Sequence, residues 1–270
     1  MNEITQHPIK HLASITVCGS DALTFLQGQC TQDIKKIPSF GALPGAFCSA
    51  KGRVVSNVLV HRVNDSQDDF ELLCHASSAA LLYDHLKKYV PFFRGTKMSI
   101  TSNAALNMVG YIGTGDRPGF KLNDLMSLEL NSPAINEELD TAEQWLVEEI
   151  KQGVLWLDEH QFEQWIAQNI NLDSLNTVSF TKGCYTGQEV VARLHYKGSS
   201  KKRLYAVRAT DSMTTSQSIS ANGKTVGNLL QCAHWGPHSY GLAVIKTDAT
   251  EGPLFITENE QLQLELLHSF

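Results

Sequence analysis

The chain of 270 residues is long enough for one large domain or two modest ones, and it can bury a sizeable core. Hydrophobic residues make up 42% and charged residues 19%, and 28 acidic against 22 basic residues give a net charge of −6. That balance argues against a protein whose main task is non-specific binding of nucleic acid, although it allows a local basic patch. The sequence contains no apolar run of about 18 residues and no pattern of a secretion signal, so we expect a soluble, cytoplasmic protein without membrane spans.

The first half of the chain predicts strands that alternate with short helices. Strands are predicted over 11–19 and 70–75, and two more over 46–63 with a break at Lys51-Gly52. Ser20 is the expected cap of a helix over 22–34, and Ser77 or Ser78 opens a second helix that Pro91 closes.

The second half predicts two further helices and then a run of short strands. The helices are expected over 141–153, between a Thr141 cap and a Gly153 stop, and over 158–168. From residue 201 onward, short alternating strands separated by turn residues are typical of a small antiparallel barrel. We therefore predict an α+β fold with a region over 1–200, a barrel domain over 201–270, and a boundary within KGSSKKR (197–203).

The six cysteines do not form C-x-x-C pairs, and we expect reduced thiols, several of them buried. One further pattern, Cys232, His234 and His238, has the spacing C-x-H-x-x-x-H. A zinc site needs a further ligand and closed geometry, and the intervening Trp-Gly-Pro predicts a turn, so we predict no metal site.

KGCYTGQE (182–189) is the stretch with the most chemistry. Thr186 and Glu189 have the T-x-x-E spacing of a capping box directly before apolar residues, which predicts a helix that opens at Gly187. Cys184 then lies just ahead of the helix start, where unpaired N–H groups favour a thiolate, and Lys182 could add to that field. Arg193 adds to it if the chain folds back. No histidine stands at a spacing that identifies a base.

Residues 171–204, which contain this motif, resemble the signature of the YgfZ family, folate-binding proteins similar to the T-protein (aminomethyltransferase, GcvT) of the glycine cleavage system. Segments 25–34, 46–62 and 143–153 agree with the family in the same order along the chain. The resemblance implies a GcvT-like cloverleaf of α/β lobes around a central channel, with a C-terminal antiparallel β-barrel. The first region, with a second lobe trimmed within 95–140, would bind tetrahydrofolate.

The resemblance also implies a process: assembly or repair of iron–sulfur proteins and, through it, methylthio modification of tRNA. Expected partners are folate and iron–sulfur proteins such as radical-SAM tRNA-modifying enzymes, and direct contact with tRNA is left open. The cations of KGSSKKR are candidates for RNA phosphates or a protein partner, against a plain solvated connection.

Candidate folate-binding residues come from several segments. Trp145 resembles a family aromatic that contacts folate, and its indole suits stacking on a flat ring; the alternative is an ordinary core tryptophan. Lys51 and Arg53 are cations for the glutamate tail, against a solvated turn, and the Asn57 amide can hydrogen bond a pterin edge. The motif and its helix contribute Tyr185, Gln188, Glu189 and Arg193.

One departure from the T-protein weakens the case for ordinary catalysis. Where the aminomethyltransferase loop carries an aspartate pair, this chain has Ser56 and Asn57, neither of which can act as a carboxylate base. We therefore favour a folate-binding accessory protein with Cys184 as the functional thiol and Lys182 as the residue that tunes it. The alternatives are a folate-dependent one-carbon transferase or demethylase and, without catalysis, an RNA-binding module.

Overall fold

The computed structural model describes residues 4–102, 106–132 and 142–270. The chain divides into two compact units. The first comprises Met1–Ala142, Trp156–Gln164 and Asn176–Val190, and the second comprises Glu143–Leu155, Trp165–Leu175 and Val191–Phe270.

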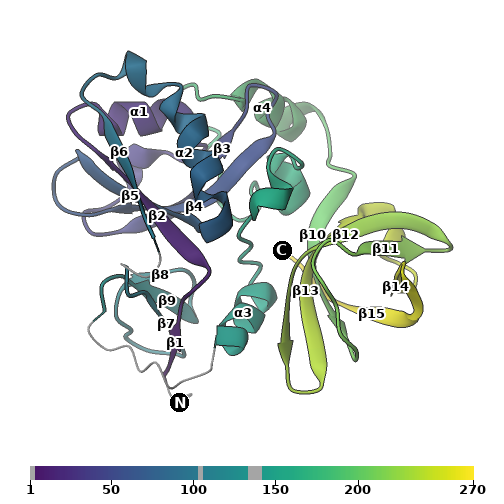
Figure 1. Cartoon of the computed structure of the whole chain (residues 1–270). Coiled ribbons are helices and arrows are strands. Elements are labelled where there is room, and N and C mark those ends of the chain that lie inside the picture. Colours follow the sequence, from purple (N-terminus) through teal and green to yellow (C-terminus); the bar gives the residue numbers. More distant parts are fainter. Residues whose placement is uncertain (1–3, 103–105, 133–141) are drawn as a thin grey trace. The chain divides into compact units, whose positions relative to one another are not determined.

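A five-stranded antiparallel sheet with two helices on one face forms the core of the first unit (Figure 1). Its strands are ordered β3-β4-β5-β2-β6 and comprise β2 (Leu12–Cys18), β3 (Ala42–Cys48), β4 (Val54–Arg62), β5 (Asp69–His75) and β6 (Lys97–Thr101). Alternate residues such as Ile15 and Val17 of β2 point to the face that α1 (Ala22–Gln29) and α2 (Ala79–Lys87) cover. The predicted strands are confirmed. The first helix, α1, is shorter than predicted, and its predicted cap Ser20 is wrong: Asp21 holds the cap position, and its carboxylate accepts from the Gly95 N–H instead.

A smaller antiparallel sheet completes the first unit, in the order β1-β7-β9-β8. It comprises β1 (Thr5–Pro8), β7 (Val109–Ile112), β8 (Phe120–Lys121) and β9 (Met126–Glu129). The described residues of 96–132 contain no α-helix. The trimmed second lobe that the sequence predicts within 95–140 falls partly on residues that the structure does not describe, so it stays a prediction.

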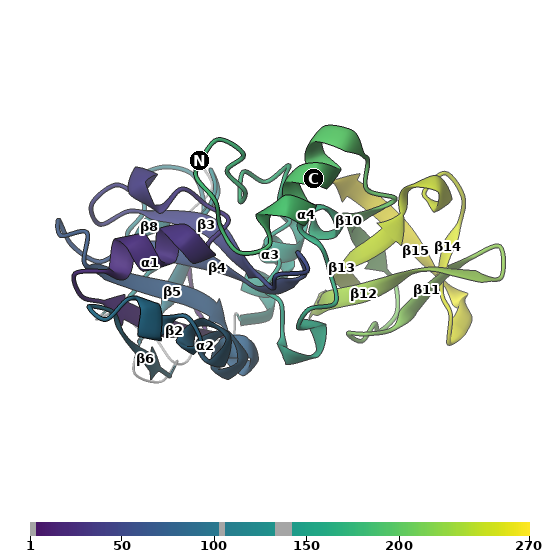
Figure 2. The same cartoon turned by 90° about the horizontal axis from the view of Figure 1, so that it is seen from above.

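The second unit contains the closed barrel, which confirms the predicted fold class (Figure 2). Its six strands follow the order β10-β13-β12-β11-β14-β15 and comprise β10 (Lys202–Ala209), β11 (Ser218–Ala221), β12 (Lys224–Trp235), β13 (His238–Lys246), β14 (Leu254–Ile256) and β15 (Asn259–Ser269). Pairing of β10 with β15 closes the barrel around fully buried residues such as Val207 and Leu229. The predicted domain boundary at residue 200 stays a prediction.

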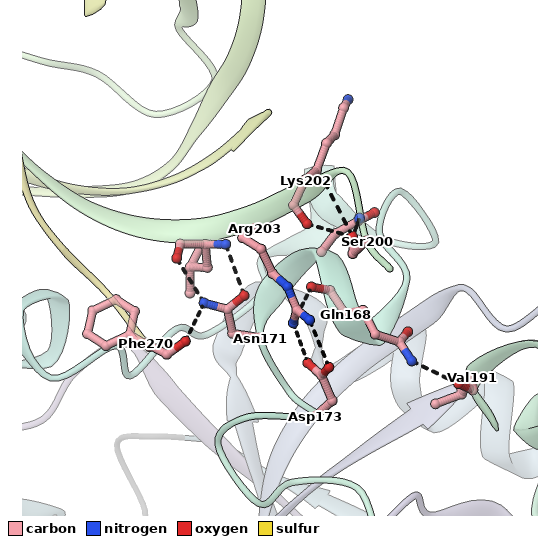
Figure 3. A network of polar contacts seen from close by, with 10 residues as sticks. Gln168, Asn171, Asp173, Val191, Ser200, Lys202, Arg203 and Phe270 are labelled. Atoms are coloured by element: carbon pink, nitrogen blue, oxygen red, sulfur yellow. Dashed lines mark hydrogen bonds and ion pairs between the residues drawn. The ribbon is translucent and has the colours of Figure 1, made fainter. Parts of the chain in front are cut away.

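Residues 165–175 are fastened to the first barrel strand by a polar network (Figure 3). The two terminal guanidinium nitrogens of Arg203, Nη1 and Nη2, donate to the Asp173 carboxylate at 2.6 and 3.1 Å. Bidentate, charge-assisted pairs of this geometry are among the stronger hydrogen bonds in proteins. The Asn171 amide pairs with the backbone of Leu204 in both directions and also donates to the Phe270 carbonyl at 3.2 Å. This network holds the end of the chain and the start of the barrel on one segment.

Of the two helices predicted between residues 141 and 168, one needs correction and the other is confirmed. The helix predicted over 158–168 is wrong: this stretch holds two short 3-10 turns, Glu159–Gln161 and Ala167–Ile170. They are separated because Glu163 has a positive φ of 54° and its N–H donates to the Val54 carbonyl of β4. The helix over 141–153 is confirmed as α3 (Ala142–Lys151), with its predicted cap Thr141 outside the described residues.

Among the described residues, no helix has the length and apolar character needed to cross a bilayer.

Candidate functional site

Cys184 lies in an exposed loop directly before α4 (Gln188–Lys197). A Cβ added at the preceding Gly183 would meet no atom within 4 Å outside its chain neighbours, so the space at that position is open. The other described cysteines are buried or half-buried. Burial raises the pKa of the Cys30 thiol, and it raises those of Cys48 and Cys74 to about 12, which keeps these thiols protonated and inert. Cys184 is therefore the thiol that a ligand or partner can reach most directly.

Lys182 anchors the loop. Its buried ammonium donates to the backbone carbonyls of Gln27, Cys30 and Gln32 at 2.7, 2.7 and 2.9 Å. These carbonyls lie at the C-terminal end of α1, where the helix dipole favours a cation, and together they occupy all three N–H groups. Burial lowers the pKa of Lys182. The geometry gives Lys182 a structural role, and its influence on the Cys184 thiol stays a prediction.

Two glycines with positive φ let the motif loop pack against the β3–β4 turn. A Cβ at Gly187, with φ of 85°, would lie 2.6 Å from the Ser49 carbonyl oxygen and 2.8 Å from the Cβ of Cys48. A Cβ at Gly52, with φ of 70°, would lie 2.5 Å from the Cβ of Val190. Since no other residue has so little bulk, these glycines explain why two segments far apart in the sequence can meet.

The helix start is built differently from the predicted capping box. The helix begins at Gln188, one residue later than predicted, and the Thr186 hydroxyl donates to Oε1 of Gln29 at 2.8 Å. Gln188 itself reaches back, because its Oε1 accepts from the N–H of Tyr185 at 3.2 Å. Glu189 is exposed on the first turn, so its predicted capping role is wrong, whereas a role in binding stays a prediction.

Tyr185 lies under the loop. Its ring is 5.3 Å from the Lys182 ammonium, and burial followed by the nearby Cys48 and Cys30 raises the pKa of its hydroxyl. That hydroxyl is buried without a hydrogen-bond partner among the described residues. Tyr185 is thus a packed aromatic whose buried hydroxyl has no hydrogen-bond partner among the described residues.

The β3–β4 turn brings two predicted cations next to the motif loop. Lys51 and Arg53 are both exposed, and Nη1 of Arg53 donates to the Gln164 carbonyl at 2.7 Å, which leaves its other donors toward solvent. Within β4, the buried Ser56 hydroxyl donates to the Asn57 carbonyl, and Oδ1 of Asn57 accepts from the Leu157 N–H at 2.9 Å. The side chains of Ser56 and Asn57 thus hydrogen bond the backbone, and neither supplies a carboxylate.

Two candidates belong to the second unit. Trp145 of α3 is 1% exposed, so its indole presents no open face for stacking in this structure, and its contact with folate stays a prediction. Arg193 is exposed on α4. The His234 ring bonds the Ser239 hydroxyl, Cys232 lies near the Thr215 hydroxyl, and no group of three metal-binding side chains occurs in the described part of the chain.

The sequence did not predict the polar residues at and after the end of α1 whose side chains hydrogen bond the motif loop and the segment before it. Gln29 receives the Thr186 hydroxyl, and the side chain of Gln32 donates to the carbonyls of Pro44 and Asn176. The buried Thr31 hydroxyl donates to the Thr177 carbonyl. The available signal was the run of polar residues in 27–33, at a place where apolar residues would otherwise continue a helix.

Comparison with known proteins gives the family. The chain is 30% identical over 232 residues to the tRNA-modifying protein YgfZ of Edwardsiella ictaluri, a match that covers 73% of this chain and 68% of that protein. The chain belongs to the YgfZ family. The YgfZ of Yersinia enterocolitica is 30% identical, covering 72% and 67%, and that of Hamiltonella defensa is 32% identical, covering 71% and 66%.

Two further matches concern the fold. Residues 201–268 match the family model described as CAF17, C-terminal beta-barrel domain, which coincides with the YgfZ-family barrel seen here. The crystal structure of glycine cleavage system aminomethyltransferase T from Bartonella henselae superposes with a TM-score of 0.67 at 12% identity, covering 99% of this chain and 85% of that one. The predicted likeness to the T-protein fold is confirmed.

Proposed function

We propose that this YgfZ-family protein binds tetrahydrofolate and acts as an accessory protein in the assembly or repair of iron–sulfur enzymes, and thereby in tRNA modification by methylthiolation. The observation that carries the proposal is the exposed Cys184 on a loop fixed by the Lys182 anchor and by the close approach at Gly187. A thiol needs a held position as much as reactivity if it is to meet one partner repeatedly.

The residues around this loop fit the anionic end of a folate. Lys51 and Arg53 stand on the turn that Gly52 and Gly187 press against the motif loop, and Lys51 has no ion pair among the described residues. Cations so placed would hold a glutamate carboxylate through charge-assisted hydrogen bonds. When bound, tetrahydrofolate would supply an amine centre that accepts one-carbon groups.

The chemistry of β4 supports an accessory role over aminomethyl transfer. Ser56 and Asn57 have no carboxylate, and their hydrogen bonds to the backbone tie them to the fold. A base that takes a proton from the folate amine would have to come from elsewhere. A folate-dependent one-carbon transferase or demethylase with Cys184 as nucleophile is therefore the second reading, and the experiment below separates the two.

Titration calorimetry with tetrahydrofolate tests the proposal. We expect saturable binding that Lys51→Ala combined with Arg53→Ala weakens about tenfold, since two charge-assisted contacts would be lost. Lys201→Ala combined with Lys202→Ala serves as a matched control on the second unit and should leave binding unchanged.

Absence of tetrahydrofolate binding by the wild-type protein would refute the proposal. A second assay mixes protein, tetrahydrofolate and candidate amine donors and measures methylene-tetrahydrofolate. We expect no turnover, and turnover that Cys184→Ala abolishes would replace the accessory role with that of an enzyme.

A further inference from the structure

A basic surface with one protruding aromatic ring lies at the end of α2. It comprises Lys87, Lys88, Phe92, Arg94 and Lys97, and we call it the α2–β6 patch. Phe92 is 80% exposed, the largest exposed fraction among the large hydrophobic residues that the structure describes. Its four cations are exposed and have no ion pair within the described part of the chain.

The ring is held outward by a rigid turn. Phe92 ends the 3-10 turn Val90–Phe92, whose proline fixes the backbone. The next residue, Phe93, points inward and meets the Phe25 ring edge-on at 5.4 Å between centroids. The N–H of Gly95 donates to the Asp21 carboxylate at 2.8 Å, which closes the turn onto α1. Since its neighbours are fixed in the core, the exposure of Phe92 is a built feature of the surface and not slack in a loop.

The charge of the patch runs against that of the whole chain. The net charge is −6, yet the sequence from His85 to Gly115 contains no aspartate or glutamate. Of the acids close to the patch, Asp21 is engaged by the Gly95 N–H, and Asp84 is exposed one helical turn before Lys88. A local excess of cations on an acidic protein is complementary to a polyanion.

We infer that the α2–β6 patch binds RNA, with its cations on backbone phosphates and Phe92 stacked against an unpaired base. Stacking on an aromatic side chain between phosphate-binding cations is how proteins hold single-stranded RNA, in loops and at ends. The inference rests on the proposed role in tRNA modification, because that role supplies an RNA as partner.

The patch is tied to the motif loop through α1. Asp21 and Phe25 hold the patch turn from one end of that helix, and the carbonyls of Gln27 and Cys30 hold Lys182 at the other end. The eight residues of α1 span about 12 Å at 1.5 Å per residue. The turn that carries Phe92 and the Lys182 anchor of the motif loop are thus held by the same short helix.

Fluorescence anisotropy with labelled, unfractionated bacterial tRNA, at a series of salt concentrations, tests the inference with the full chain. Phe92→Ala should weaken binding about tenfold without changing the salt dependence, since stacking carries no charge. Phe92→Trp, which keeps an aromatic face, should bind like the wild type. Lys88→Gln with Lys97→Gln should reduce the slope of log K against log salt by about 1.5.

The matched control removes two cations outside the patch. Lys224→Gln with Lys246→Gln, two exposed barrel lysines outside both the patch and KGSSKKR, should leave tRNA binding unchanged, and an equal or larger loss there would overturn the inference. So would wild-type affinity in Phe92→Ala, or wild-type protein that binds phosphatidylserine vesicles and not tRNA.

The tetrahydrofolate titration is run on the same samples. Folate binding without tRNA binding overturns this inference alone, and absence of folate binding by the wild-type protein overturns the proposed function.

Discussion

At the scale of single residues, Lys182 and Cys184 have separate tasks although they are two positions apart. The Lys182 ammonium is enclosed by three carbonyls, whereas the Cys184 thiol is exposed. A buried ammonium tolerates its loss of hydration only because every N–H is bonded. The lysine therefore belongs to the framework of the fold, and the cysteine lies on the exposed surface.

Loss of the Lys182 ammonium should act mainly on the stability of the fold. Lys182→Met keeps the length of the side chain and leaves three carbonyls without their donor, so we expect the free energy of unfolding to fall by about 2–4 kcal/mol. Urea denaturation measures the change. The exposed Lys201→Met should stay within about 0.5 kcal/mol of the wild type, and a Lys182→Met protein as stable as that control would contradict the anchoring role.

At the scale of elements, the motif loop packs closely against the β3–β4 turn. Gly52 and Gly187 both have positive φ; Gly187 faces atoms of the β3–β4 turn and Gly52 faces Val190 of α4, each at distances that exclude a Cβ. The loop is thereby placed by its contact with a hairpin that begins at Ala42, far earlier in the chain. Substitutions at these glycines should act on both segments together.

Gly187→Ala and Gly183→Ala separate close approach from loop composition. Gly187→Ala should lower the free energy of unfolding by about 2 kcal/mol or more, because a Cβ is disfavoured at this φ and would strike the Ser49 carbonyl. Gly183→Ala faces open space and should change it by less than about 0.5 kcal/mol. Equal midpoints of urea unfolding in the two variants would show that the close approach is absent in solution.

The success of sequence reasoning differs between local and distant contacts. The strands of the first sheet and the barrel were predictable because alternation of apolar residues is a local signal. The capping box at Thr186 was also a local inference, and it failed because a hydroxyl that prefers a cap finds Gln29, remote in sequence, instead. The helix over 158–168 failed for a similar reason, since Glu163 gives its N–H to β4.

The functional site shows the same division. The motif identified the loop and its exposed thiol, whereas the carbonyl cage of Lys182 could not be predicted, because backbone carbonyls carry no trace in the sequence. The α2–β6 patch was missed because exposure, not composition, distinguishes Phe92 from its neighbour Phe93.

At the scale of the whole molecule, the fold resembles that of an aminomethyltransferase, whereas the departure of its site residues from that enzyme stays a prediction. The T-protein-like architecture extends over the chain, residues 201–268 match the model described as CAF17, C-terminal beta-barrel domain, and β4 carries Ser56 and Asn57, where the resemblance predicts acids in the aminomethyltransferase. A fold can be kept while its chemistry is replaced, because function resides in a few side chains at one site. In our proposal, the exposed Cys184 thiol is the group that carries the function of this chain.

The most direct measurement is the level of methylthiolated tRNA in a strain that lacks the native gene and carries Cys184→Ala, with the activity of an iron–sulfur enzyme scored in parallel. Cys232→Ala, a half-buried barrel thiol, is the matched control. We predict that the control restores both readouts and that Cys184→Ala, expressed at the same level, restores neither above about a tenth of the wild type. Full restoration by Cys184→Ala would contradict the claim that this thiol carries the function.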